Sequence, residues 1–133
     1  MILKGRVIYP GNAHGKALVS RQAISFFGGV HPDNGIILEN GHDLEGYSVA
    51  HTILAFPNGK GSTVGSYTIY RLKQNGVAPA AILNVECEPI IAVGCIISEI
   101  PCIDQITIDQ IPQGALIRVN GENGLVEIIE NSI

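Results

Sequence analysis

A strand, a glycine-rich loop and a helix follow one another in the middle of this sequence, and this order constrains the fold more than any other feature. Residues 49–56 are mostly apolar, which predicts a buried strand that Pro57-Asn58-Gly59 ends. A helix is predicted over residues 64–74, and Asn75-Gly76 ends it as a C-cap pair. The side chains expected to face the core from this helix are Val64, Tyr67, Ile69 and Leu72.

Short strand-like runs occupy both ends of the chain. Asn120-Gly121 and Asn123-Gly124 separate the last two runs, which indicates a β-hairpin. An apolar segment, 90–98, follows Pro89, and its periodicity fits either a helix or a buried strand. We therefore predict one domain over residues 1–133, with a barrel-like or layered β/α fold. The remaining predicted strands are 2–9, 16–20, 35–38, 80–85, 115–119 and 125–129.

Composition narrows the function classes. Only 15% of the residues are charged and 46% are hydrophobic, so the chain has enough apolar side chains to fold. The net charge of −4 argues against a nucleic-acid role driven by a basic face. The longest apolar stretch, 90–97, is far short of the roughly 20 residues that span a membrane. The first residues do not resemble a signal peptide, so we expect a cytoplasmic protein.

The three cysteines show no metal-ligand spacing. Cys87, Cys95 and Cys102 are expected to be small buried thiols, and no CxxC or HxxxH pattern is present. The four histidines are scattered, and the acidic residues form no evident pair for acid–base chemistry. We therefore expect no metal site on this chain, and the ligands of any metal centre would come from elsewhere.

The glycine-rich loop is the segment best suited to chemistry. Ser62 or Thr63 is the expected N-cap of the helix, and free N–H groups there favour a carboxylate, a phosphate or a developing alkoxide. Lys60 adds a positive charge nearby. The loop matches neither the phosphate-binding GxxxxGK[ST] pattern nor the GxSxG nucleophile pattern. The alternative is that Ser62 and Ser66 only cap a helix after a tight turn.

Six motifs occur along the chain in a fixed order. They are GKALVS (15–20), ISFFGGV (24–30), GKGSTVGS (59–66), NGVAPAAI (75–82), IAVGCIISE (91–99) and IRVNG (117–121). Together they resemble the small subunit, or swivel domain, of the aconitase X family, over nearly the whole chain. The resemblance implies a swivelling β/β/α fold, like the mobile domain of aconitase.

The resemblance also implies a heteromeric hydro-lyase. Its aconitase X large subunit would hold a [4Fe–4S] cluster on its own cysteines, and its substrate would be a small phosphorylated hydroxy acid. In the stand-alone archaeal members the reaction removes water from (R)-5-phosphomevalonate to give trans-anhydromevalonate 5-phosphate, a step of the archaeal mevalonate route to isoprenoids. The loops 26–33 and 60–66 are expected to face the large subunit.

In this family the serine of the GxGS motif is the proton acceptor, and this role carries over to Ser62. A serine hydroxyl is a poor base unless it is activated, which the helix N-terminus and Lys60 are expected to do. Relatives commonly have Asp-Pro where this chain has His31-Pro32, and Arg where it has Lys60. The residues expected to bind the substrate or support the loop are Lys60, Gly61, Thr63, Gly65, Ser66, Gly28 and Gly29.

Two alternatives stay open. Other aconitase X members dehydrate hydroxyprolines such as cis-3-hydroxy-L-proline, but they are often one fused chain, so a separate 133-residue subunit favours the archaeal reaction. The second alternative is a non-catalytic binding module that uses the swivel fold, in which Ser62 is only a cap.

Overall fold

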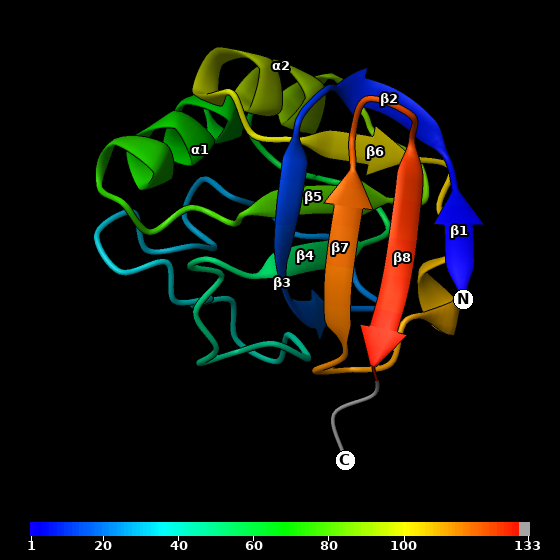
Figure 1. Ribbon diagram of the computed structural model, residues 1–133. Helices are drawn as coiled ribbons and strands as arrows, with labels where there is room; N and C mark the ends of the chain where they lie inside the picture. The colour runs from blue at the N-terminus through cyan, green and yellow to red at the C-terminus, as the bar shows by residue number, and fades with distance from the viewer. Residues whose placement is uncertain (131–133) are drawn as a thin grey trace.

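The computed structural model describes residues 1–130 (Figure 1). The helices are α1 (Gly65–Gln74), α2 (Pro89–Ser98) and the short 3-10 helix η1 (Ile108–Gln110). The strands are β1 (Ile2–Lys4), β2 (Arg6–Tyr9), β3 (Asn12–Val19), β4 (Ile53–Phe56), β5 (Ala81–Asn84), β6 (Cys102–Asp104), β7 (Leu116–Asn120) and β8 (Leu125–Glu130). None of the helices within the described range is long and apolar enough to cross a membrane.

The sheet closes on itself at Gly5. Its strand order is β1-β8-β7-β3-β4-β5-β6-β2, so the two edge strands are consecutive in sequence and only Gly5 separates them. The N–H of Gly5 donates to the carbonyl oxygen of Gly124 at 2.9 Å. A side chain at position 5 would collide with the carbonyl oxygen of Asp104, so only glycine fits. The result is a barrel-like core without free long edges.

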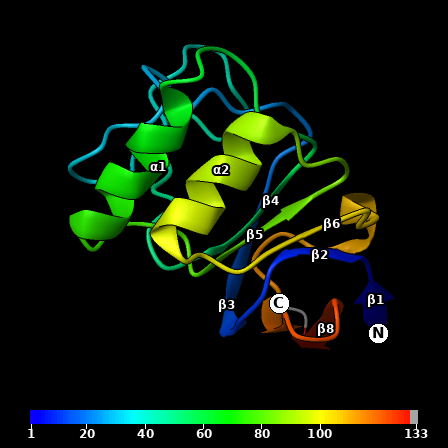
Figure 2. The same ribbon diagram turned by 90° about the horizontal axis from the view of Figure 1, so that it is seen from above.

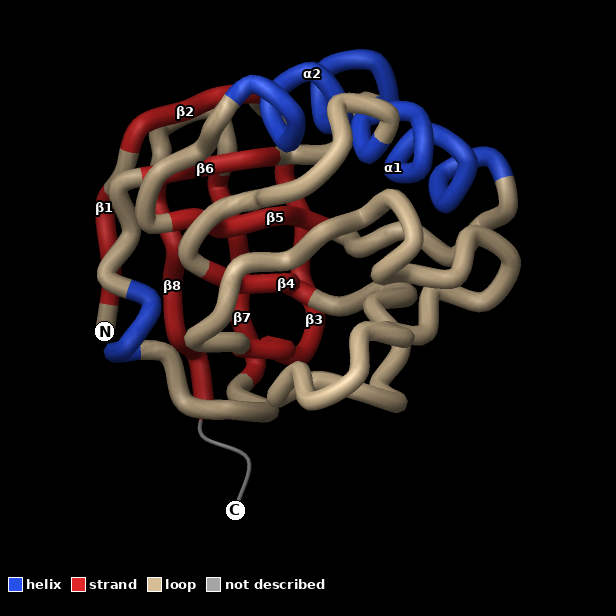
Figure 3. Tube along the Cα trace, turned by 180° about the vertical axis from the view of Figure 1, so that it is seen from behind, coloured by secondary structure: helices blue, strands red, loops and turns tan. Residues whose placement is uncertain are grey.

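The long strand β3 connects two halves of this sheet. Residues 12–16 of β3 pair antiparallel with β7, and residues 17–19 pair parallel with β4. The strands β7 and β8 therefore cross β4, β5 and β6, as seen from the front in Figure 1 and from behind in Figure 3. Figure 2 shows α1 and α2 on the other side of β4–β6. The layers are β/β/α, which confirms the predicted fold class.

Alternating side chains divide the core into two clusters. Ile53 and Ala55 of β4 pack between the two sheet halves, whereas Leu54 and Phe56 face the helices. All four side chains are fully buried. Burial of a Leu or Phe side chain stabilises the fold by about 1.5–3 kcal/mol, so β4 is held from both faces.

The prediction of α1 is correct in position and partly wrong in orientation. Ile69 and Leu72 are fully buried, as expected, but Val64 and Tyr67 are 45% and 66% exposed. The buried stripe follows Ser66, Ile69 and Leu72, which are spaced by three residues, so Tyr67 faces solvent. The segment 90–98 is a helix, which settles the helix-or-strand alternative, and the hairpin of β7 and β8 is confirmed.

Several predicted strands differ in extent. The run 2–9 is broken at Gly5, and the strand expected at 16–20 begins at Asn12. The segment 35–38 forms only isolated bridges. The strand expected from residue 49 begins at Ile53, because residues 49–52 form a turn with His51 at a φ of 62°. The strand expected at 80–85 spans residues 81–84, and β6 and η1 were not predicted.

Candidate functional site

The glycine-rich loop leaves the sheet at the carboxyl ends of parallel strands. Pro57 follows β4, Val85 follows β5 and Gln105 follows β6. Together with Arg21 and residues 106–109 they line a cavity of about 590 Å³. Ligands of open α/β sheets commonly bind at this edge. The loop that leads to Ser62 therefore starts beside a cavity at the edge of the sheet where a ligand is expected.

A backbone bridge brings two predicted loops together. The N–H of Ile24 donates to the oxygen of Asn58 at 3.2 Å, and the N–H of Lys60 donates to the oxygen of Ile24 at 3.1 Å. The loop that contains Gly28 and Gly29 and the loop 59–66 therefore run side by side. Phe27 lies at this junction and is 55% exposed.

Glycines are required at two points of the loop. Gly59 is buried, and a side chain there would collide with the carboxylate of Glu88 and the side chain of Ile91. Gly61 has a φ of +86°, which favours glycine, and it lies against the hydroxyl of Ser25. The loop is thus packed on one side and exposed from Lys60 to Val64.

Ser62 is exposed and caps a turn that precedes the helix. Its Oγ accepts a hydrogen bond from the N–H of Val64 at 3.2 Å. The expectation that Ser62 or Thr63 is the N-cap of α1 is wrong, because the N-cap is Val64. An additional turn, closed by a 2.9 Å bond from the N–H of Gly65 to the oxygen of Ser62, separates Ser62 from the helix.

Three consecutive N–H groups are free at this turn. Within residues 1–130, the backbone N–H groups of Gly61, Ser62 and Thr63 have no acceptor. The start of α2 differs, because the Glu88 carboxylate already accepts hydrogen bonds from the first N–H groups of that helix at 2.9 and 3.2 Å. An anion is therefore favoured at the turn before α1, where the donors are unpaired.

Lys60 lies beside these donors in an ion pair. Its Nζ is 3.0 Å from Oε2 of Glu39, with side chains that are 47% and 32% exposed. No motif marks Glu39 in the sequence, because the contact joins residues 21 positions apart and depends on the fold. Ser25, whose Oγ donates to the oxygen of Phe27 at 3.2 Å, also carries no sequence signal of its own.

The other expected site residues divide into exposed and packed positions. Thr63 and Gly28 are exposed, and Gly28 has a φ of +82° with open space around it. Gly29 is packed against the carbonyl oxygen of Ser25, and Gly65 against Ile90. Ser66 is buried, and its Oγ donates to the oxygen of Ile90 at 2.6 Å, which ties α1 to α2.

His31 and Asp33 lie apart from Ser62. The Nδ1 of His31 accepts the N–H of Asp33 at 3.1 Å, so the two residues share one local turn. The carboxylate of Asp33 is 3.9 Å from the guanidinium of Arg71, in the last turn of α1. Ser62 precedes that helix, so this turn lies toward the opposite end of α1.

The three cysteines are free thiols packed in or near the core. Cys95 and Cys102 are buried, as predicted, and Cys87 is half-buried. The Sγ atoms of Cys87 and Cys102 are 3.9 Å apart, and their hydrogen bond, together with burial, raises the pKa of Cys87. Within residues 1–130, no three His, Cys, Asp or Glu side chains are grouped so as to hold a metal ion.

Comparison with known proteins gives a match over nearly the whole chain. The family model described as the aconitase X swivel domain matches residues 2–128. The phosphomevalonate dehydratase small subunit of Methanosarcina acetivorans is 51% identical over 131 residues, covering 96% of this chain and 91% of that protein. The protein of the same name from Thermococcus kodakarensis is 50% identical over 131 residues, and the match covers 98% of this chain and 98% of that protein.

Two solved structures share the fold. The crystal structure of Thermococcus kodakaraensis aconitase X in its holo-form aligns with a TM-score of 0.96 at 49% identity, covering 98% of this chain and 99% of that one. The solution NMR structure of a UPF0107 protein aligns with a TM-score of 0.89 at 44% identity, covering 98% of this chain and all of that one.

Proposed function

This chain belongs to the aconitase X swivel-domain family, and on that basis we propose that it is the small subunit of a phosphomevalonate dehydratase. The reaction is the removal of water from (R)-5-phosphomevalonate to give trans-anhydromevalonate 5-phosphate, in the cytoplasm. The observation that supports this proposal most is the match, at about 50% identity and over nearly full length, to small subunits of that name from several archaea.

The partner is an aconitase X large subunit, which would carry the [4Fe–4S] cluster. The described cysteines of this chain are unsuited to hold a cluster, because Cys95 of α2 and Cys102 of β6 are fully buried in the apolar core between helix and sheet. An iron–sulfur cluster on the partner, when bound, supplies a Lewis acid for the leaving hydroxyl group. This chain supplies the proton acceptor and part of the anion-binding surface.

Ser62 takes the proton from the carbon next to the substrate carboxylate. That C–H bond and the C–O bond of the neighbouring hydroxyl break, a C=C bond forms, and the hydroxyl departs as hydroxide. The proton that Ser62 has taken up then passes to this hydroxide, which gives the water released and regenerates the serine alkoxide. The serine must be deprotonated to act, so its alkoxide needs stabilisation. The free N–H groups of residues 61–63 lie at Ser62 and can stabilise this alkoxide, and the ammonium of Lys60 can bind an anionic group of the substrate.

Domain closure explains why the proton acceptor lies on a separate subunit. Ser62 and Lys60 are exposed in the loop that follows β4, although Glu39 contacts the Lys60 ammonium. Movement of this surface onto a substrate held by the large subunit would bring the base into reach and exclude water. The exposed side chains of Phe27, Val64 and Tyr67 would then be covered by the partner.

Reconstitution tests the proposal. The chain alone is expected to be inactive, and co-purification with an aconitase X large subunit is expected to give dehydration of (R)-5-phosphomevalonate. Ser62→Ala in the complex is expected to lower kcat by about 10²–10⁴-fold, the usual contribution of a general base. Activity on cis-3-hydroxy-L-proline in its place would favour the other aconitase X reaction, and no hydro-lyase activity at all would favour a binding module.

A second variant distinguishes the two possible roles of Ser62, as catalytic base and as capping residue of the turn. Asn at position 62 can still accept the N–H of Val64 in an Asx turn, but it has no hydroxyl to deprotonate. If Ser62 is the base, Ser62→Asn is as inactive as Ser62→Ala. Substantial activity in Ser62→Asn would assign Ser62 to capping alone.

A further inference from the structure

The segment 39–45 contacts the glycine-rich loop although it is distant in sequence. We name this segment the brace. Glu39, at its start, holds the Lys60 ammonium at 3.0 Å. Two residues further on, the N–H of Gly41 donates to Oε1 of Glu45 at 3.0 Å, which closes the brace on itself.

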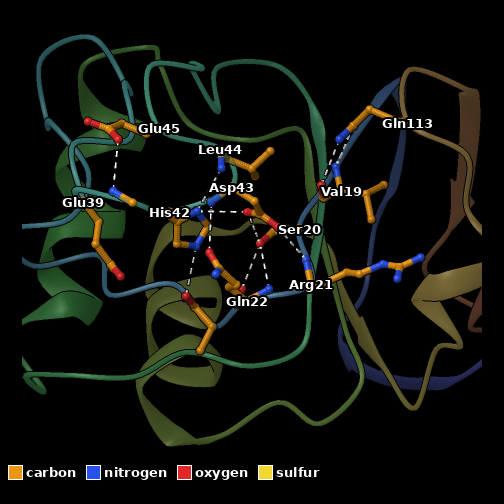
Figure 4. A network of polar contacts seen from close by, with 12 residues as sticks. Val19, Ser20, Arg21, Gln22, Glu39, His42, Asp43, Leu44, Glu45 and Gln113 are labelled. Carbon is orange, nitrogen blue, oxygen red and sulfur yellow. Dashed lines mark hydrogen bonds and ion pairs between the residues drawn. The ribbon is translucent and has the colours of Figure 1, made fainter.

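Asp43 fixes the brace to the end of β3. Its carboxylate accepts hydrogen bonds from the hydroxyl of Ser20 at 2.7 Å and from the N–H of Arg21 at 3.0 Å (Figure 4). In return, the Oε1 of Gln22 accepts the N–H of Asp43 at 2.9 Å. Ser20 is fully buried, so this connection is shielded from water on one side.

His42 adds a second connection to the same stretch. Its Nε2 is 3.1 Å from the carbonyl oxygen of Ala23, and its Nδ1 accepts the N–H of Leu44 at 3.1 Å. The ring is buried, and Figure 4 shows it between the brace and the stretch 20–23. Residue 24 follows directly, and its backbone bonds to Asn58 and Lys60. The brace therefore contacts Lys60 in two ways. Glu39 binds the Lys60 side chain directly, and residues 20–24 connect the brace to the Lys60 backbone.

We propose that the brace sets the position of the glycine-rich loop, and that Glu39 is the positioning residue for Lys60. The inference rests on the proposed function, in which Lys60 binds an anionic group of the substrate. A free lysine side chain samples many rotamers, and a carboxylate at 3.0 Å restricts them. Exposed ion pairs of this kind contribute little to stability, so the effect of Glu39 is expected on substrate binding and not on folding.

Steady-state kinetics of the reconstituted complex test the role of Glu39. Glu39→Gln is expected to raise KM for (R)-5-phosphomevalonate by about 3–10-fold, with kcat within about twofold. Glu127→Gln is the matched control, since Glu127 forms an exposed ion pair with Arg118 at 3.2 Å elsewhere, and no change is expected. In a Lys60→Gln background, Glu39→Gln is expected to have no further effect. Additive effects of the two changes, or a lower KM in Glu39→Gln, would overturn the proposal.

Amide hydrogen exchange of the full chain tests the backbone route without any activity. Asp43→Asn is expected to speed exchange at Ile24 and Lys60 by about tenfold, while Ile82 and Leu83 of β5 stay protected. Gln22→Ala, at an exposed residue, is the second variant if Asp43→Asn does not fold. Unchanged amide exchange at positions 24 and 60, or an equal acceleration of exchange in β5, would contradict the proposal that the brace positions the loop. An inactive wild-type complex would instead refute the proposed function. The exchange measurement would still test whether the brace positions the loop, because it does not depend on activity.

Discussion

Arg6 and Asp104 form a two-bond ion pair where the sheet closes. The Nε of Arg6 is 3.0 Å from Oδ1 of Asp104, and its Nη2 is 2.8 Å from Oδ2. Arg6 is the first residue of β2 and Asp104 the last residue of β6, and the two strands pair at this point. Oδ2 also accepts the N–H of Cys87 at 3.0 Å. The Asp104 carboxylate therefore links β6 to β2, through Arg6, and to the turn before α2, through Cys87.

This pair predicts acid sensitivity. Burial by itself would raise the pKa of Asp104, but the hydrogen bonds from Arg6 and from Cys87 bring it below the usual value of 3.8. A lowered pKa in the folded state stabilises the protein above the unfolded-state pKa, and this contribution is lost as the pH falls through the folded-state value. Arg6→Gln is expected to lower the urea midpoint clearly at pH 7 and less at pH 3, which lies below the unfolded-state pKa. Arg118→Gln, which breaks an exposed pair, serves as the control; an equal loss at both pH values would contradict the prediction.

Gly59→Ala is expected to disturb both the loop and the start of α2. The added methyl group would overlap the Glu88 carboxylate and the Ile91 side chain, so the cap of α2 must move. We expect a loss of about 2–3 kcal/mol in the free energy of unfolding, in the upper part of the range for changes that overpack a core. Gly46→Ala is the comparison, because Gly46 has a positive φ but open space around it, and about 1–2 kcal/mol is expected there. Thermal or urea unfolding measures both losses of stability. A smaller loss for Gly59→Ala than for Gly46→Ala would show that the loop and the start of α2 can shift to accommodate the methyl group.

Ser66→Ala is expected to show the opposite pattern to Ser62→Ala. Loss of the 2.6 Å bond leaves the partly buried carbonyl of Ile90 without this donor and costs about 1–2 kcal/mol of stability. Turnover of the complex, measured well below the melting temperature, is expected to stay within about threefold of wild type. A large fall in kcat with unchanged stability would instead place the Ser66 hydroxyl in contact with the substrate.

Cys87 is expected to react slowly with thiol reagents although it is only half-buried. Its hydrogen bond with Cys102, burial and the carboxylates of Asp104 and Glu88 all raise the pKa of the Cys87 thiol. The thiolate is the reactive form, so the native protein at pH 8 is expected to react with iodoacetamide at least tenfold more slowly than the urea-unfolded protein. Equal rates in the two states would show that the thiol is free of these contacts.

Local sequence signals predicted the parts of the fold that depend on local chemistry. Helix α1, the hairpin of β7 and β8, and the glycine-rich loop after β4 all carry turn or capping residues at their ends. The segment that forms α2 was located, but its periodicity left helix and buried strand open. The resemblance to aconitase X gave the layer order. Whether Ser62 is a base and Lys60 a substrate ligand remains a prediction that the variants above test.

Long-range contacts account for what sequence reasoning missed. The run 2–9 is uniformly strand-like, and its break at Gly5 follows only from the two distant partners β8 and β6. The strand β6 has three residues, too few for a periodic pattern. Val49 is fully buried yet lies in a turn, because burial there comes from packing under the helices and not from pairing in a sheet. Glu39 likewise meets Lys60 only after the chain has folded.

The closure at Gly5 also sets an order of events during synthesis. β2 can pair with β6 once residues 102–104 have left the ribosome, but β1 pairs Ile2 with Glu127 and must wait for the hairpin of β7 and β8. Contacts between residues so far apart in sequence form slowly. Until then β8 has no neighbour on one side, and a nascent chain in this state offers an open edge to other chains. The pairing of β1 with β8 thus makes closure of the sheet depend on a strand near the start of the sequence joining one that is made more than a hundred residues later.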